Sequence, residues 1–214
     1  MLNITLIVSK VLITQSSVER ITLARRKKNT QMKNYYKLVV IVLMIVMAGF
    51  CRLLTNYLAY HTSLPLFNFT PIAAMGLFAG ANLRDKKLAF ALPIITLFFT
   101  DLALGLHSGV FAVYGSIALI TGIGIWLEKK QNIIRIIGAS LASSVIFFTI
   151  TIGFVWFQNP TYTQNFSGLL ACYTAGIPFF GNTVAGDLFF CAVLFGGYSF
   201  LKYRTGALIA AKNN

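Results

Sequence analysis

Six apolar segments follow one another along most of the chain, and a short polar stretch separates each from the next. They cover residues 36–54, 67–83, 88–106, 109–127, 136–157 and 169–201. An α-helix rises about 1.5 Å per residue, so about 20 apolar residues are needed to cross the hydrocarbon core of a bilayer. Only 11% of the residues are charged, about half of what is usual in soluble domains. The pattern predicts an all-α integral membrane protein, a bundle of six transmembrane helices.

The last apolar segment is too long for one span. Pro178 and Gly181 predict a break, which leaves residues 181–201 as the sixth helix. Residues 169–180 would then form a short helix or loop across the outer mouth of the bundle. Such irregular backbone must be covered by protein or line a cavity.

The basic residues predict the orientation of the bundle. Lys and Arg occur in the leader, in the loops at residues 84–87 and 128–135, and in the tail. The intervening loops, at residues 56–66, 107–108 and 158–168, contain none. Because positive loops stay inside, both termini are expected in the cytoplasm.

The same charges organise the chain into three parts. Residues 1–35 form a basic cytoplasmic leader, residues 36–204 the membrane domain and residues 205–214 a cytoplasmic tail. The leader is either a flexible tail or a mis-assigned start, with translation beginning at Met32. The net charge of +13 comes from short runs beside apolar segments, as in membrane proteins, so nucleic acid is not an expected partner.

Two acidic residues, Asp101 and Asp187, lie inside predicted spans. A charged side chain at the bilayer centre costs about 2.5–3.5 kcal/mol even on lenient insertion scales, so each needs a function or a partner. Arg52 is expected at the outer end of the first helix and Asn182 at the outer start of the sixth. Polar groups therefore gather in the outer third of the bundle, and the candidate substrate-binding residues are Arg52, Asn68, Thr70, Asp101, His107, Asn182 and Asp187. This cluster is either a solute cavity open to the outside or a structural network in which Arg52 pairs with one aspartate.

The sequence does not complete any of three enzyme motifs, so the chain is not expected to be an enzyme. Residues 138–141 (GASL) are similar to the serine motif of rhomboid proteases, but both histidines, His61 and His107, precede Ser140. The sequence contains no HExxH motif and no P-loop. Its three cysteines have no metal-ligand spacing, and neither a metal nor a cofactor is expected.

Small residues indicate close helix packing. Gly76 and Gly80 form a GxxxG pattern in the second segment, which brings helices together within one chain or between chains. Packing within the chain is the expected role, and docking to a partner subunit is the alternative.

Four stretches resemble a family of uncharacterised bacterial membrane proteins described as transport proteins. They are residues 68–81 (NFTPIAAMGLFAGA), the segment from Pro93 to TDLALG at residues 100–105, residues 169–173 (LLACY) and residues 178–187 (PFFGNTVAGD). That family is in turn similar to the substrate-binding S components of energy-coupling-factor (ECF) vitamin transporters. The resemblance covers residues from about 36 to 201 and implies an ECF S-component-like fold in the bacterial cytoplasmic (inner) membrane.

The resemblance implies uptake of a small polar solute, a vitamin or its precursor, bound near the outer face. Its partners would be a transmembrane coupling subunit and ATPases, together with the lipid bilayer. Residues 38–48 lack the alanine-rich AxxxA docking face of S components, so the protein either works alone or uses another partner. Two alternatives remain: a proton-coupled secondary carrier using Asp101 or Asp187, and a non-transport scaffold that docks through its glycine faces.

Overall fold

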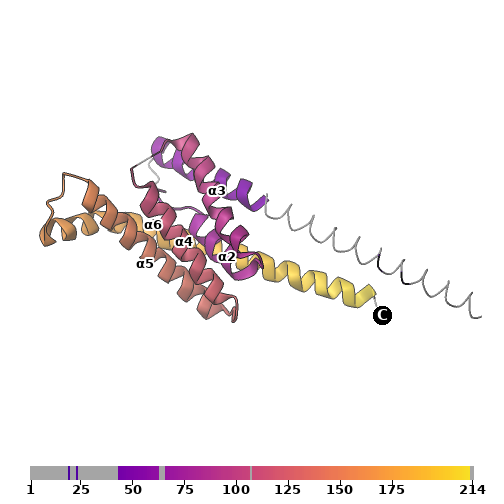
Figure 1. The fold of residues 1–214 in the computed structure, drawn as a ribbon. Helices are drawn as coiled ribbons and strands as arrows, with labels where there is room; N and C mark the ends of the chain where they lie inside the picture. Colours follow the sequence, from indigo (N-terminus) through magenta and orange to yellow (C-terminus); the bar gives the residue numbers. More distant parts are fainter. Residues whose placement is uncertain (1–18, 20–22, 24–42, 63–65, 107, 213–214) are drawn as a thin grey trace, which may run out of the picture. The chain divides into compact units, whose positions relative to one another are not determined.

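The computed structural model describes residues 19, 23, 43–62, 66–106 and 108–212 (Figure 1). From residue 43 onward, this part consists of helices joined by short connections. A helix over Leu43–His61 is followed by α2 (Ile72–Asn82), α3 (Lys86–Leu104), α4 (Val110–Leu127), α5 (Ile133–Gln158) and α6 (Phe166–Lys212). Five of these helices are long and apolar enough to cross a membrane. The prediction of an all-α membrane bundle is confirmed, and the packing described below lies within the compact unit Met44–Asn214.

The helix α2 corrects the predicted second span. It has 11 residues and starts at Ile72, whereas the apolar pattern predicted a helix over residues 67–83. Residues 66–71 instead form a turn in which Asn68 has a φ of 65°, and Pro71 directly precedes the helix. All residues of α2 except the last are buried. The helix is apolar on every side because it lies in the core of the bundle, and its length of about 17 Å is shorter than a usual membrane span.

The first helix also differs from its prediction. It continues to His61 rather than ending at Leu54, so much of the predicted outer loop is helical. Arg52 therefore lies in the middle of the described helix and not at its outer end.

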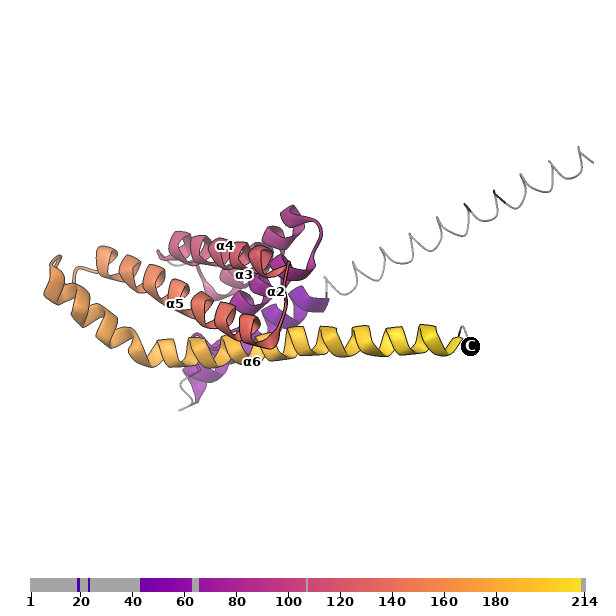
Figure 2. The same cartoon turned by 90° about the horizontal axis from the view of Figure 1, so that it is seen from below.

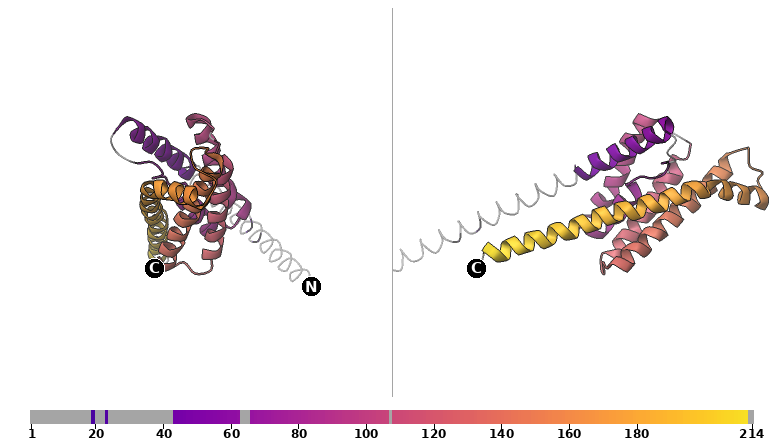
Figure 3. Two further views of the ribbon diagram at one scale, coloured as in Figure 1. Left: turned by 90° about the vertical axis from the view of Figure 1, so that its left-hand side faces the viewer. Right: turned by 180° about the vertical axis from the view of Figure 1, so that it is seen from behind.

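The helix α6 corrects the predicted break at Pro178 and Gly181. It is continuous from Phe166 to Lys212, with Pro178 inside it, so residues 169–180 are its first turns and no separate element. Figure 2 shows the helix bending within its orange part, and Figure 3 shows it continuing past the other helices. Proline removes one backbone hydrogen bond and bends a helix without always ending it, and α3 likewise continues through Pro93. Asn182 and Asp187 consequently lie within α6, not near its start.

The helices α2 and α4 cross closely at glycine residues (Figure 1). A methyl group on Gly80 would overlap the Thr121 carbonyl oxygen, and one on Gly124 would overlap the Leu77 carbonyl oxygen. A methyl group on Gly76 would lie 2.9 Å from the Thr121 hydroxyl. The prediction that Gly76 and Gly80 pack within the chain is confirmed, so α4 occupies this face of α2.

Lys86 joins the ends of three helices on the side away from the candidate site. Its ammonium group donates to the carbonyl oxygens of Gly80 at 3.2 Å and Leu83 at 2.9 Å. It also pairs with Glu128 at 2.7 Å. Since the last carbonyls of a helix lack backbone partners, a lysine at this position satisfies groups that are otherwise unpaired.

Replacing Lys86 by alanine is expected to lower the free energy of unfolding by about 1–2 kcal/mol, because hydrogen bonds from a charged group are lost while the exposed ion pair contributes little. Unfolding by SDS titration in mixed micelles, followed by circular dichroism, measures this loss. The neighbouring Lys87 is exposed, so Lys87→Ala is a matched control with an expected change within about 0.5 kcal/mol. Equal effects of the two substitutions would contradict the capping role.

Candidate functional site

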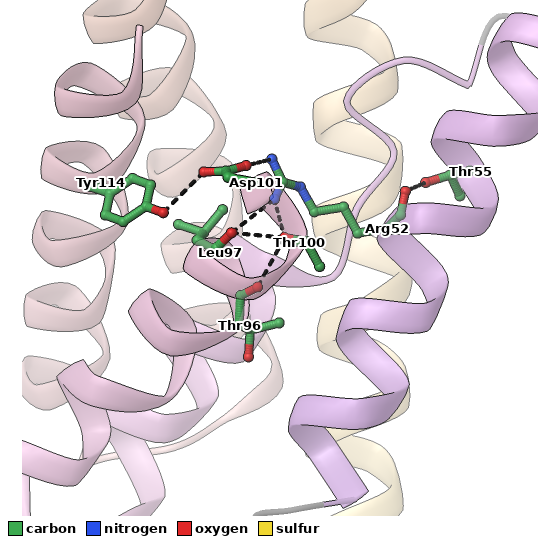
Figure 4. Close-up of polar contacts among 7 residues, drawn as sticks. All are labelled: Arg52, Thr55, Thr96, Leu97, Thr100, Asp101 and Tyr114. Atoms are coloured by element: carbon green, nitrogen blue, oxygen red, sulfur yellow. Dashed lines mark hydrogen bonds and ion pairs between the residues drawn. The ribbon is translucent and has the colours of Figure 1, made fainter. Parts of the chain in front are cut away.

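A buried ion pair links the Leu43–His61 helix to α3 (Figure 4). The Arg52 guanidinium lies 2.7 Å from the Asp101 carboxylate, and the two side chains are 15% and 2% exposed. Arg52 also donates to the Thr100 hydroxyl and, at 3.5 Å, to the Leu97 carbonyl oxygen. The arginine side chain is thus held against α3 by both of its terminal nitrogen atoms.

Asp101 has a second partner on α4. The Tyr114 hydroxyl donates to the other carboxylate oxygen at 3.0 Å, so both oxygens of Asp101 are used (Figure 4). Burying a carboxylate is costly unless it is paired and hydrogen-bonded, and this carboxylate is both. Asp101 is therefore the fixed counter-ion of Arg52.

Asp187, the other acid inside a helix, has a different environment. It lies on α6, is 3% exposed, and accepts a 2.7 Å hydrogen bond from the Ser144 hydroxyl on α5. In the part of the chain that the structure describes, the ion pairs are Arg52–Asp101 and Lys86–Glu128, and neither includes Asp187. The two aspartates predicted as equivalent site residues thus have distinct electrostatic environments.

The turn at residues 66–71 packs on α6 one helical turn before Asp187. The Asn182 amide donates to the Phe67 carbonyl oxygen at 3.1 Å. A methyl group on Gly186 would lie 3.2 Å from the Phe69 Cα atom, so glycine permits the close approach of the turn. Asn68 adopts a left-handed backbone conformation, which asparagine tolerates better than most residues. These contacts join the two segments NFTP and GNTVAGD and position Asn68 and Thr70 beside Asp187.

A cavity of about 110 Å³ lies between these elements. Its lining combines polar groups from the first helix, the turn and α6 with apolar side chains from α2, α3, α4 and α5. The lining residues are Arg52, Asn68, Thr70, Ile72, Ala73, Leu97, Val113, Ile117, Phe147, Thr183 and Asp187. Asn68 is exposed whereas Asp187 is buried, so Asn68 lies nearer the mouth and Asp187 nearer the base.

The structure brings together most of the residues that the sequence predicted. Arg52, Asn68, Thr70 and Asp187 line the cavity, and Asp101 lies behind Arg52. Asn182 is not in the lining and instead holds the turn. His107 lies outside the described residues.

Several polar residues at the site were not predicted. Thr183 lines the cavity, Ser144 binds Asp187, and Tyr114 and Thr100 bind the ion pair. Serine and threonine inside a helix usually bond to the preceding turn, as Thr183 does with the Phe179 carbonyl oxygen at 3.0 Å. The sequence signal that could have found Thr183 is its position four residues before Asp187, on the same face of the helix.

The chemistry available at the cavity is binding by oxygen atoms. Within the described residues, no three His, Cys, Asp or Glu side chains gather as a metal-binding group. The oxygen atoms available as ligands belong to the Asn68 amide, the Thr70 and Thr183 hydroxyls and the Asp187 carboxylate. This set can hold a small polar or cationic group.

The apolar helices and the polar cavity among them define an α-helical membrane protein. The chain belongs to the family of unknown function DUF6580, whose sequence pattern matches residues 32–208. No curated protein and no solved structure matches the chain. The family covers all four stretches on which the resemblance to transport proteins rests.

Proposed function

We propose that this protein is a membrane transport protein that binds a small polar solute on the outer side for uptake. The observation that carries the proposal is the cavity, where Asp187 and the hydroxyls of Thr70 and Thr183 face a space among apolar helices. Ionisable groups inside a membrane domain commonly mark solute or ion pathways. The alternation of basic and uncharged loops supports both termini in the cytoplasm and the turn at residues 66–71 on the outer side, with this turn and α2 together making the second of six crossings.

The size of the cavity limits the solute. Sites for drug-sized ligands usually have volumes of about 300–1,000 Å³, and this cavity has about 110 Å³. The likeness to ECF S components supports uptake, but a whole vitamin would require the helices to move apart. The proposal therefore favours a solute, or a part of one, of only a few non-hydrogen atoms.

A proton-coupled secondary carrier is the second candidate function. It is favoured by Asp187, which has a hydroxyl partner and no ion pair among the described residues. A carboxylate that takes up and releases a proton would have to lie in such a place. Uptake into proteoliposomes driven by a pH gradient alone would distinguish this mechanism from uptake that needs a coupling subunit and ATPases.

The binding proposal predicts that a small polar solute raises the melting temperature of the purified protein in a thermal-shift screen. Thr183→Val is expected to weaken that binding about tenfold, because one hydrogen bond to the solute is lost in a low-dielectric site. Titration of the solute found in the screen measures the change in Kd.

Thr151→Val is the matched control. Thr151 bonds to its own helix, at 2.7 Å to the Phe147 carbonyl oxygen, much as Thr183 does, but it is not in the cavity lining. This variant is expected to bind as the wild type does. If no amine, amino acid, sugar, nucleobase or vitamin stabilises the protein, or if both variants bind equally well, the proposal is wrong.

A further inference from the structure

The charges around the cavity do not balance. Arg52 and Asp101 neutralise one another across 2.7 Å, and Arg52 is further held by Thr100 and Leu97 of α3. Asp101 has its second oxygen bonded to Tyr114. The Arg52 guanidinium is therefore bound by groups of α3 and does not pair with Asp187. An ionised Asp187 would leave the described part of the cavity with one uncompensated negative charge.

An uncompensated carboxylate at this depth is unfavourable. Asp187 is 3% exposed, and its bond from Ser144 satisfies only one of its two oxygens. An isolated buried charge is retained only when a counter-ion or several hydrogen bonds replace its hydration. A positively charged occupant beside the carboxylate would balance its charge and remove this cost.

The other cavity groups suit a small cation. The side chains of Asn68 and Thr70 make no hydrogen bond within the described residues, and Thr183 uses its hydroxyl proton on the Phe179 carbonyl oxygen. Their oxygen atoms can thus face an occupant as acceptors. Carboxylate, amide and hydroxyl oxygens are the ligands that hard cations prefer, and they also accept hydrogen bonds from an ammonium group.

We infer that the cavity is a binding site for a small monovalent cation, with Asp187 as its counter-ion and Thr70, Thr183 and Asn68 as its oxygen ligands. The cation is either an inorganic ion such as Na⁺, bound beside the solute, or the primary ammonium group of the solute itself. Both sources share the same chemistry, a compact positive charge that fits about 110 Å³. This inference rests on the proposed function, since it specifies what the same site binds.

The test compares the melting temperature of the purified full chain in three salts at constant ionic strength: NaCl, methylammonium chloride and N-methyl-D-glucamine chloride. The last supplies a cation too large for the cavity. At a hundredfold excess over its Kd, a specific cation is expected to raise the melting temperature by about 5–10 °C. A response to NaCl alone identifies an inorganic ion, and a response to methylammonium alone identifies an ammonium group. A response to both supports a site that accepts either.

Asp187→Asn is the decisive variant, because it keeps the shape and the Ser144 contact while removing the charge. It is expected to be at least as stable as the wild type in N-methyl-D-glucamine chloride and to show no response to the other two salts. Glu128→Gln removes a carboxylate from the exposed pair with Lys86 and is expected to respond as the wild type does. Thr183→Val is a second variant, expected to weaken cation binding about tenfold.

Equal responses of the wild type and Asp187→Asn would overturn the inference, because the cation would then act at a place other than Asp187. No response of the wild type to either salt would also overturn it. If a solute binds Asp187→Asn and wild type equally well and cations have no effect, the transport proposal stands and this inference fails. If cations stabilise the wild type but not Asp187→Asn, and no solute binds, the cation site stands and the transport proposal fails.

Discussion

Replacing Arg52 by glutamine is expected to lower the free energy of unfolding by about 3–5 kcal/mol. The cause is the partner left behind: Asp101 is 2% exposed, and without the guanidinium its carboxylate would be buried with only the Tyr114 hydroxyl as donor. SDS titration in mixed micelles, followed by circular dichroism, measures the loss. A change of this size should also lower the yield of folded protein in detergent.

The double variant Arg52→Gln with Asp101→Asn tests the cause. Removing both charges of a buried pair is often nearly neutral, so the second substitution is expected to restore most of the lost stability. The coupling energy between the two sites should then exceed about 1 kcal/mol. Arg84 lies in an exposed loop, and Arg84→Gln is the matched control, with an expected change within about 0.5 kcal/mol. A double variant no more stable than Arg52→Gln would contradict the ion-pair explanation.

The fold could be predicted from sequence wherever hydropathy alone determines structure. Residues 109–127 and 136–157 were predicted as spans and correspond closely to α4 (Val110–Leu127) and α5 (Ile133–Gln158). Hydropathy reports the average environment of a segment, and a helix that crosses lipid must be apolar over about 20 residues. The prediction was accurate where that condition applied.

Two of the three helices that differed from their predictions, α2 and α6, did so because tertiary packing overrides the local sequence signal. The core helix α2 is as apolar as a spanning helix, yet its neighbours are other helices of the bundle. In α6, proline predicted a break, but the cost of a missing hydrogen bond depends on what else packs against the helix. The helix continues through the exposed Pro178 in α6 and through the buried Pro93 in α3, so proline in the local sequence does not by itself decide where a helix ends.

Most of the predicted site residues lie at the cavity, but their pairing was not predictable. They were expected at one depth because a break at Pro178 and Gly181 would set Asp187 about as far from the outer side as Asp101, and the continuous helix α6 removes that reason. Which aspartate pairs with Arg52 depends on how helices rotate about their axes. In the structure Arg52 pairs with Asp101, and Asp187 accepts a hydrogen bond from Ser144 and has no ion pair among the described residues.

Replacing Gly80 by alanine is expected to destabilise the bundle by about 3 kcal/mol, at the upper end of the usual cost of overpacking. The added methyl group would overlap the Thr121 carbonyl oxygen and lie 2.8 Å from the Ile125 nitrogen. Both are backbone atoms of α4, so neither can rotate away as a side chain would. The clash can be relieved only by moving α2 and α4 apart, which opens the core around Leu77 and Ile120. Unfolding by SDS titration measures the effect.

Gly122→Ala is the matched control on α4, since nothing lies within 4 Å of the position where its methyl group would be. Alanine favours helix over glycine by about 1 kcal/mol, so this variant should be neutral or slightly more stable. Gly76→Ala should be intermediate, because its methyl group would meet the Thr121 hydroxyl at 2.9 Å, and a side chain can adjust. The combination of Gly80→Ala with Gly124→Ala should cost less than the sum of the single changes, because one separation of the helices relieves both clashes. Full additivity, or equal effects of Gly80→Ala and Gly122→Ala, would show that close contact between α2 and α4 does not determine the stability of this core.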